Sequence, residues 1–530
     1  MSLPGPVRAP ARVAMAPAEG VLRAMVQPGA PVGRIAVIDV GSNTARLVVF
    51  ERTAEGGLRS MFESKEVPRL GKGIGPDGAL TPDAIERGRA TLRRFALQLD
   101  RLGNPPLEAV ATSAIRDAPN GPTFVNQVER DTGLRLRVIS GEEEGRLAYL
   151  GVATAWELAN DLIVDLGGGS LQAVLTHRGL PGRSTSLPLG ALRLSQRFLR
   201  HDPPKRREMR ALRGHVRRAL ADLPRRESGR RPERIYGVGG TIRCLARVAI
   251  EANRYPLHQT HGFELTRATL RDLEELMASV PASARRQLPG MTGHRADVIV
   301  AGIIVVEEVL RATDRDRLVV SGTGIREGAA VEAAGIAVPA SARALARRSL
   351  TVAHRSFGFS LEHGDAVAQS ALALFSRLRP RFGWTDSEAL ALEVAAGMHD
   401  AGMSVAGWAH EEHSAYLLSN FPFLGVDHRQ IALATLALLQ HEGAELPGDL
   451  RKIWRPVLRR AGVRTAVELG AILFVAELLD GTPVGFTLRE RTVHLRATHR
   501  AAEGLPPRVI ERIARVLRRT FQYRVVYHER

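Results

Sequence analysis

Residues 162–176 read LIVDLGGGSLQAVLT. Two apolar runs flank Asp165, three consecutive glycines and Ser170, and Gln172 opens the second run. Apolar runs around a glycine turn predict two strands of a hairpin. Such a turn exposes backbone N–H groups with no Cβ in the way, and concavities of this kind bind phosphate oxygens. The stretch therefore predicts an anion-binding hairpin with a carboxylate beside it.

A second stretch, GRIAVIDVGSNTARLVVFE at 33–51, has the same design. Asp39 precedes a Gly-Ser-Asn-Thr turn between two apolar runs, about 125 residues before Asp165. An internal repeat of this kind predicts two related domains that face each other across a cleft.

Two further glycine turns each lie between a predicted strand and a predicted helix. They occur in IYGVGGTIRCLARV at 235–248 and in RLVVSGTGIREGAAVE at 317–332. Residues 82–103 have helical spacing, so the region predicts a mixed α/β fold. From about residue 340 the Ala-Leu periodicity predicts an all-α second half, with few strands before the last 50 residues.

The 530-residue chain is basic: 74 Lys and Arg against 56 Asp and Glu give a formal net charge of +18. Excess positive charge favours a polyanionic partner such as nucleic acid, a nucleotide or a phosphate polymer. The alternative is that arginine simply replaces lysine on solvated surfaces. The Arg-dense stretch 197–234 leaves the same choice open between a solvated helix face and an anion-binding patch.

Cysteine content and hydropathy restrict the class of protein further. Cys244 is the only cysteine, which excludes an intramolecular disulfide and a Cys-based zinc site and favours a reducing cytoplasm. No apolar stretch approaches a membrane span, and residues 296–310, which include two glutamates, predict a buried helix. Residues 1–33 are rich in Pro, Ala and Gly and predict a disordered tail or an upstream start, with no signal peptide.

Carboxylates next to the glycine turns suggest metal and water chemistry. Asp39 and Asp165 can together hold Mg²⁺ through oxygen ligands, or each can simply cap its own turn. In LRLRVISGEEEGRLAYLGV at 134–152, acids open a helix, and Glu142 and Glu143 are explained by the helix dipole. Glu144 is the sharper candidate for orienting an attacking water.

The ordered set DVGSNTARLVV, ATSAIRDAPNG, ISGEEEGRLAYLGV, DLGGGSLQ, GVGGTIRCLA and SGTGIREGAAVE resembles the exopolyphosphatase/guanosine pentaphosphate phosphohydrolase (Ppx/GppA) family over about residues 34–335. The resemblance implies an actin-like (ribonuclease H-like) two-domain α/β fold of ATPase type, followed by an all-α HD-like domain. The expected parts are a tail at 1–33, domain I at 34–155, domain II at 156–337, the HD-like domain at 338–485, and a strand and helix segment at 486–530.

The resemblance also implies an activity: Mg²⁺- or Mn²⁺-dependent release of terminal orthophosphate from inorganic polyphosphate or from pppGpp. Glu144 matches the catalytic glutamate that activates water, Asp39 and Asp165 match the acids that organise metal and water, and Arg116 matches a basic residue at the cleft. The phosphate-loop positions are matched by Ser42, Asn43, Gly168, Gly169, Ser170, Gly240 and Thr241.

Basic charge favours polyphosphate as the substrate, and pppGpp is the alternative. A weakly active sensor that binds polyphosphate or nucleotide, and an ATP-using kinase or chaperone on the same fold, are the rival classes. Glu144 after the Ser-Gly turn argues against the kinase. We expect no membrane partner and no specific nucleic acid, and the resemblance makes a homodimer plausible.

One departure from the family lies in the opening stretch. Where the family commonly has Gly-Gly-Gly-Ser-Thr-Glu, this chain has Gly-Gly-Gly-Ser-Leu-Gln. Leu171 and Gln172 thus replace a hydroxyl and a carboxylate near the expected metal. Gln172 keeps hydrogen-bonding capacity but adds no charge, so weaker metal binding, altered substrate choice and lost activity are all open outcomes.

The helical half carries an ordered set of histidines and aspartates that resembles an HD-type metal-dependent phosphohydrolase. Imidazole and carboxylate suit a divalent transition metal, and the alternative is that the histidines are ordinary hydrogen-bonded helix residues. The candidate ligands are His363, His399, Asp400, His413, His441 and Asp480; His410 belongs to the same run.

Overall fold

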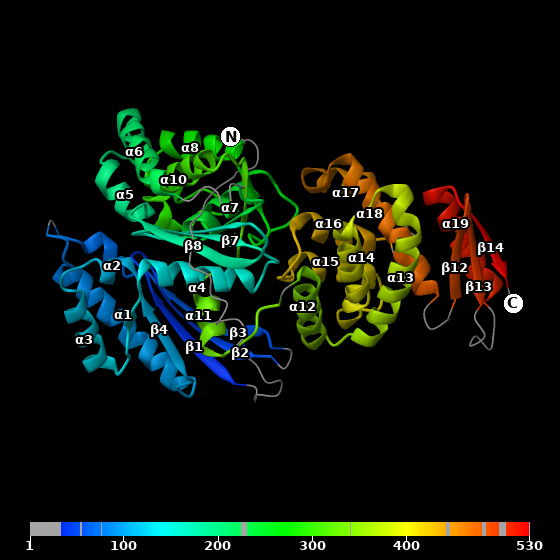
Figure 1. Ribbon diagram of the computed structural model, residues 1–530, viewed down its shortest axis with the longest axis horizontal. Coiled ribbons are helices and arrows are strands. Elements are labelled where there is room, and N and C mark those ends of the chain that lie inside the picture. The colour runs from blue at the N-terminus through cyan, green and yellow to red at the C-terminus, as the bar shows by residue number, and fades with distance from the viewer. Residues whose placement is uncertain are drawn as a thin grey trace. The chain divides into compact units, whose positions relative to one another are not determined.

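The computed structural model describes residues 33–53, 56–75, 77–223, 231–339, 341–440, 446–479, 484–497 and 505–528. The predicted tail therefore lies outside the described residues, except for residue 33. The chain divides into two compact units, Met1–Arg254 with Gln259–Ser341 and Tyr255–His258 with Ala342–Arg530 (Figure 1).

The first sheet has the strand order β3-β2-β1-β4-β5. Its strands are β1 Arg34–Val40, β2 Ala45–Arg52, β3 Leu58–Glu66, β4 Leu107–Ala111 and β5 Arg137–Val138. The helices around it are η1 Leu70–Gly73, α1 Pro82–Arg101, α2 Ser113–Arg116, α3 Gly121–Thr132 and α4 Gly141–Ala153. The predicted hairpin at 33–51 is confirmed as the antiparallel pair β1 and β2, and the helix expected over 82–103 is α1.

Strand β1 shows why this segment is buried on both faces. Ala36 and Ile38 pack in the core formed with α1 and α3, whereas Ile35 and Val37 pack in a second core with α4 and α11. Because successive strand residues point to opposite faces, the continuous apolar run of β1 supplies both cores at once.

The second sheet has the order β10-β11-β9-β6-β7-β8. Its strands are β6 Leu162–Leu166, β7 Leu171–His177, β8 Leu180–Leu187, β9 Ile235–Val238, β10 Glu264–Thr266 and β11 Arg317–Val320. Its helices are α5 Ala191–Phe198, α6 Arg206–Ala219, η2 Leu220–Asp222, α7 Gly240–Ala252, α8 Arg267–Ser279, α9 Ala282–Arg285, η3 Gly293–Arg295, α10 Ile299–Ala312 and α11 Ile325–Ala333. The opening stretch is confirmed as the hairpin β6–β7, and the apolar stretch at 296–310 forms the buried α10.

Helix α11 follows the second sheet in the chain but packs against α4 and β1. Two glycines make this close approach possible. A Cβ on Gly151 would lie 1.8 Å from the carbonyl oxygen of Gly324, and one on Gly328 would lie 1.9 Å from that of Leu147. The range 156–337 predicted for domain II therefore contains a helix that covers the first sheet, and the predicted boundaries remain a prediction.

The second unit is mainly helical, as the periodicity predicted, and its described residues form a large hydrophobic core. Its helices are α12 Ala342–Phe357, α13 Leu361–Phe382, α14 Asp386–Met398, η4 Ala401–Ser404, α15 His410–Asn420, α16 His428–Leu438, α17 Gly448–Ile453, α18 Arg455–Leu478 and α19 Pro507–Phe521. A three-stranded sheet of β12 Val484–Arg489, β13 Thr492–Ala497 and β14 Arg524–His528 packs with α19. No helix in the described ranges has the length and apolar character needed to cross a membrane.

Candidate active site

The four glycine turns of the first unit meet at one cleft of about 750 Å³, its open mouth included. The turns at 41–44, 167–170, 239–240 and 324–326 all contribute to its wall. The cleft is lined by Asp39, Gly41, Ser42, Asn43, Thr44, Arg46, Thr112, Ser113, Glu144, Asp165, Leu166, Gly167, Gly168, Ser170, Val238, Gly239, Gly240, Arg243, Arg295, Gly324, Ile325 and Arg326.

The second turn lies directly against the first lobe, which explains its glycines. A Cβ on Gly169 would lie 2.2 Å from Ser113 Oγ and 2.7 Å from Ser42 Oγ, so no side chain fits there. The carbonyl oxygen of Gly168 accepts from the backbone N–H of Leu192 at 2.9 Å. Over the part of the chain that is described, the N–H groups of Gly168 and Gly169 have no backbone acceptor. Gly168 lines the cleft, so its N–H is a donor available to a phosphoryl oxygen, whereas Gly169 lies outside the lining.

Three carboxylates share the cleft: Glu144 and Asp165 are buried, and Asp39 is half-buried. Burial raises the pKa of Glu144 to about 8, against the opposing effect of Arg116, and raises that of Asp165 to about 6. Burial also raises the pKa of Asp39. Nearby acids raise these pKa values further, because like charges in one site disfavour ionisation: Asp39 acts on Glu144 and Asp165, Asp165 acts on Glu144, and Glu327 acts on Asp39. The cleft therefore favours the binding of a positively charged group.

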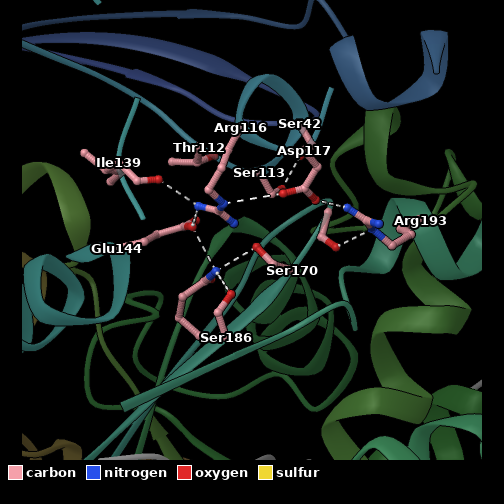
Figure 2. A network of polar contacts seen from close by, with 12 residues as sticks. Ser42, Thr112, Ser113, Arg116, Asp117, Ile139, Glu144, Ser170, Ser186 and Arg193 are labelled. Carbon is pink, nitrogen blue, oxygen red and sulfur yellow. Dashed lines mark hydrogen bonds and ion pairs between the residues drawn. The ribbon is translucent and has the colours of Figure 1, made fainter. Parts of the chain in front are cut away.

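Glu144 is held at one oxygen by two donors, as Figure 2 shows. Arg116 Nη1 and Gln172 Nε2 each lie 2.8 Å from Glu144 Oε2. Gln172 Nε2 also lies 2.7 Å from Ser170 Oγ and 3.0 Å from Ser186 Oγ. The residue that departs from the family pattern is therefore in direct contact with the predicted catalytic glutamate.

The donor set of the cleft suits a hard divalent cation. Asp39 and Asp165 offer carboxylate oxygens, which Mg²⁺ prefers. Two buried amides add unsatisfied atoms: among the described residues Gln172 Oε1 has no hydrogen-bond partner, and neither polar atom of the Asn43 side chain has one. Because unpaired buried amides are costly, the Asn43 atoms, which lie in the cleft wall, are suited to meet a cation, a water or a substrate oxygen; Gln172 lies outside that wall.

Four arginines at the cleft were missed by the sequence reasoning: Arg46, Arg243, Arg295 and Arg326. Burial, helped by the neighbouring guanidinium groups, lowers the pKa of Arg243 and of Arg295 to about 10, so both stay charged at neutral pH. A signal for three of them was available, because Arg46, Arg243 and Arg326 each stand two residues beyond a turn residue (Thr44, Thr241 and Gly324). Arg295 has no such local signal.

The remaining predicted residues are placed as follows. Thr241 is fully buried and its Oγ1 accepts from Arg295 Nη1 at 2.9 Å, so it supports the cleft from behind its wall. Glu143 pairs with Arg137 on the surface, in keeping with a role away from the chemistry. Arg213 and Arg217 of the Arg-dense stretch pair with Glu308, so these two arginines are neutralised by carboxylates.

Comparison with known proteins decides the family. Residues 48–335 match the Ppx/GppA phosphatase family, and residues 346–484 match domain III of the same phosphatases. This chain belongs to the Ppx/GppA phosphatase family. The resemblance found in the sequence is thereby confirmed, together with an actin-like two-domain α/β fold and a helical C-terminal part.

Two curated relatives of this Ppx/GppA phosphatase carry different names. Exopolyphosphatase 1 of Mycobacterium tuberculosis is 33% identical over 299 residues, which are 56% of this chain and 86% of the relative. Guanosine-5'-triphosphate,3'-diphosphate pyrophosphatase of Aeromonas salmonicida is 26% identical over 472 residues, 87% of this chain and 92% of the relative. A solved exopolyphosphatase from Cytophaga hutchinsonii superposes with a TM-score of 0.53 at 27% identity, covering 57% of this chain and 99% of that one.

In the helical unit, three of the six candidate ligands converge. The ligand atoms of His363, His399 and Asp400 all lie within 4.8 Å of one another. His399 Nδ1 lies 2.7 Å from the carbonyl oxygen of Ala396. Since a carbonyl only accepts, Nδ1 carries the proton and the neutral ring presents its Nε2 lone pair. His410 Nε2 lies 3.9 Å from Asp400 Oδ1.

The other three candidates are not part of this group. His413 lies on α15 outside the converging set that the described residues form. His441 and Asp480 lie outside the described residues.

Proposed function

We propose that this phosphatase releases terminal orthophosphate from inorganic polyphosphate. The observation that carries the proposal is the carboxylate of Glu144, held by Arg116 and Gln172 in a cleft that is lined by four arginines. A phosphoryl group needs positioning and charge neutralisation far more than covalent help. The cleft supplies both, with a backbone donor at Gly168 and the guanidinium groups of four arginines in its wall.

The chemistry assigned to the residues is an in-line attack of water on the terminal phosphorus. Glu144 takes the proton of the water, the new P–O bond forms, and the anhydride P–O bond breaks so that the shortened chain leaves with the electron pair. Arg116 and Gln172 hold the carboxylate in place. Asp39 and Asp165 are the residues that would hold Mg²⁺, which neutralises phosphoryl oxygens when bound.

The choice of polyphosphate over pppGpp rests on charge. The net charge of +18 and the four cleft arginines favour a long polyanion over one nucleotide. The relative named exopolyphosphatase has the higher identity, whereas the relative named for guanosine-5'-triphosphate,3'-diphosphate aligns over more of the chain. Hydrolysis of pppGpp is therefore the second candidate, and a weakly active sensor is the third.

Phosphate release from long-chain polyphosphate, pppGpp and ATP, each with Mg²⁺ or Mn²⁺, tests the proposal. We expect polyphosphate to be the best substrate and Glu144→Gln to lower kcat by about 10²- to 10⁴-fold. Glu143→Gln is the matched control, since that side chain pairs with Arg137 away from the cleft. Faster release from pppGpp would favour the second candidate. Retained polyphosphate binding without release from any substrate would favour the sensor.

For the helical unit we propose an HD-like fold that binds a divalent transition metal through His363, His399 and Asp400. Two imidazoles and a carboxylate suit such an ion, and the tautomer of His399 points a lone pair toward His363, whose Nε2 lies 3.1 Å away. Metal analysis of the whole protein should show one bound ion per chain beyond the Mg²⁺ of the cleft. His399→Ala should lose it and His413→Ala should keep it; equal metal content in both variants would reject the site.

The homodimer is kept as a proposal that rests on the family resemblance. Light scattering of the full chain should give about twice the mass of one chain, and the mass of a single chain would reject it.

A further inference from the structure

Arg193, on the first turn of α5, makes two contacts that no predicted residue explains. Its Nε donates to the carbonyl oxygen of Gly169 at 2.8 Å, and its Nη2 forms an ion pair with Asp117. The backbone N–H groups of Ala191 and Leu192 donate to the carbonyl oxygens of Gly167 and Gly168. The start of α5 therefore holds the second glycine turn from behind, and Arg193 links it to the opposite lobe.

Asp117, at the C-terminal end of α2, passes this link toward Glu144. Its Oδ1 lies 3.4 Å from Arg116 Nε. Arg116 Nη1 in turn lies 2.8 Å from Glu144 Oε2 and 3.0 Å from the carbonyl oxygen of Ile139. Asp117 thus forms an ion pair with the guanidinium group that also binds the Glu144 carboxylate.

The contacts close into a ring, which can be followed in Figure 2. From Glu144 the ring continues through Gln172 to Ser170, which belongs to the same glycine turn that Arg193 holds at Gly169. Two neighbouring residues of the turn, Gly169 and Ser170, are therefore linked to the Glu144 carboxylate by separate routes, one through the Arg193–Asp117 pair and one through Gln172.

We infer that Asp117 and Arg193 are a positioning pair that couples the phosphate-holding turn to Glu144. The inference rests on the proposed function only in taking Glu144 as the group that acts on water. Neither side chain lines the cleft. An ion pair whose side chains are 37% and 39% exposed adds little to stability. Its effect is instead to set the position of the turn relative to Glu144. When the pair is intact, the turn and the carboxylate keep one separation, which phosphoryl transfer requires.

The test measures kcat and KM for Asp117→Asn, Arg193→Gln and the double variant on whichever of the three substrates the wild type hydrolyses best. We expect each single change to lower kcat about tenfold, with KM within about threefold of wild type. The kcat of the double variant should be no lower than that of the poorer single variant, because both changes break the same coupling between the turn and Glu144. Glu264→Gln and Arg317→Gln, which break an exposed pair at the far end of β11, serve as controls and should leave kcat unchanged.

Amide hydrogen exchange gives a readout that needs no substrate. The N–H groups of Ala191 and Leu192 should exchange faster in Asp117→Asn than in Glu264→Gln, because the turn that accepts from them is loosened. Unchanged exchange in Asp117→Asn, additive losses of kcat, or losses that follow a lower thermal midpoint would each overturn the pair as a positioning device. If only the proposed substrate is wrong, the wild type will hydrolyse pppGpp or ATP faster than polyphosphate, and the difference in amide exchange will still be observed.

Discussion

Gln172→Glu restores the carboxylate that the family pattern commonly has and is the most informative single change. The amide nitrogen of Gln172 lies 2.8 Å from Glu144 Oε2, and both side chains are buried. Two unit charges at that separation repel by about 6 kcal/mol at an effective dielectric constant near 20. That repulsion is an upper bound of about four pKa units, added to a Glu144 pKa that burial has already raised to about 8.

The metal-free variant should therefore keep one proton shared between the two carboxyl groups well above pH 7, as closely spaced carboxylates do. A divalent cation reverses this, because the added negative charge at residue 172, opposite Asp165 in the β6–β7 hairpin, favours binding it. We expect the Mg²⁺ concentration for half-maximal phosphate release to fall at least about tenfold, equivalent to 1.4 kcal/mol.

The assay is phosphate release against Mg²⁺ concentration at several pH values, with isothermal titration of Mg²⁺ as a direct measure of affinity. Gln196→Glu is the matched control, since it adds the same charge to an exposed site outside the cleft wall. An unchanged Mg²⁺ requirement in Gln172→Glu, or the same change in Gln196→Glu, would refute the reasoning.

Three further outcomes are expected. The pKa of Glu144 in the folded protein, about 8, lies above its ordinary 4.5. Its stabilising contribution to the fold is therefore complete below pH 4.5 and is lost as the pH rises through 8. In melts with chelator, the thermal midpoint of Glu144→Gln should fall less over this pH range than that of the wild type. Arg116→Met removes the ion pair that lowers the Glu144 pKa, so the basic requirement seen in kcat/KM should move about one pH unit upward, and pH-rate profiles will measure it. Arg295→Met removes a buried cation from the cleft and should raise KM for polyphosphate about tenfold with kcat less affected, whereas an unchanged KM would remove Arg295 from the binding surface.

Local sequence pattern predicted the fold well. Apolar runs around glycine turns identified both hairpins, and the helical spacing of 82–103 identified α1, which ends two residues earlier at Arg101. The placement of α11 on the first sheet could not be predicted in this way. It depends on Gly151 and Gly328 fitting against backbone atoms that are distant in the sequence. The pattern of apolar residues within α11 does not show which element the helix packs against.

The site was predicted in part. Residues inside the glycine motifs were found because turn chemistry is local, and Asp39, Glu144 and Asp165 do line one cleft. Arg295 was missed because its neighbours in sequence show no pattern, and it enters the cleft through a contact with Thr241, 54 positions away.

By itself, the sequence determined that two acid-bearing glycine turns exist and that a glutamine follows the second. Those features are set by backbone sterics and by residue type, which act over a few positions. Only the tertiary structure decided that Gln172 contacts Glu144, which is 28 positions away in the chain. The same holds for the ion pair between Arg193 and Asp117. Hydrogen bonds require separations near 3 Å, and only the packing of two lobes brings such groups together.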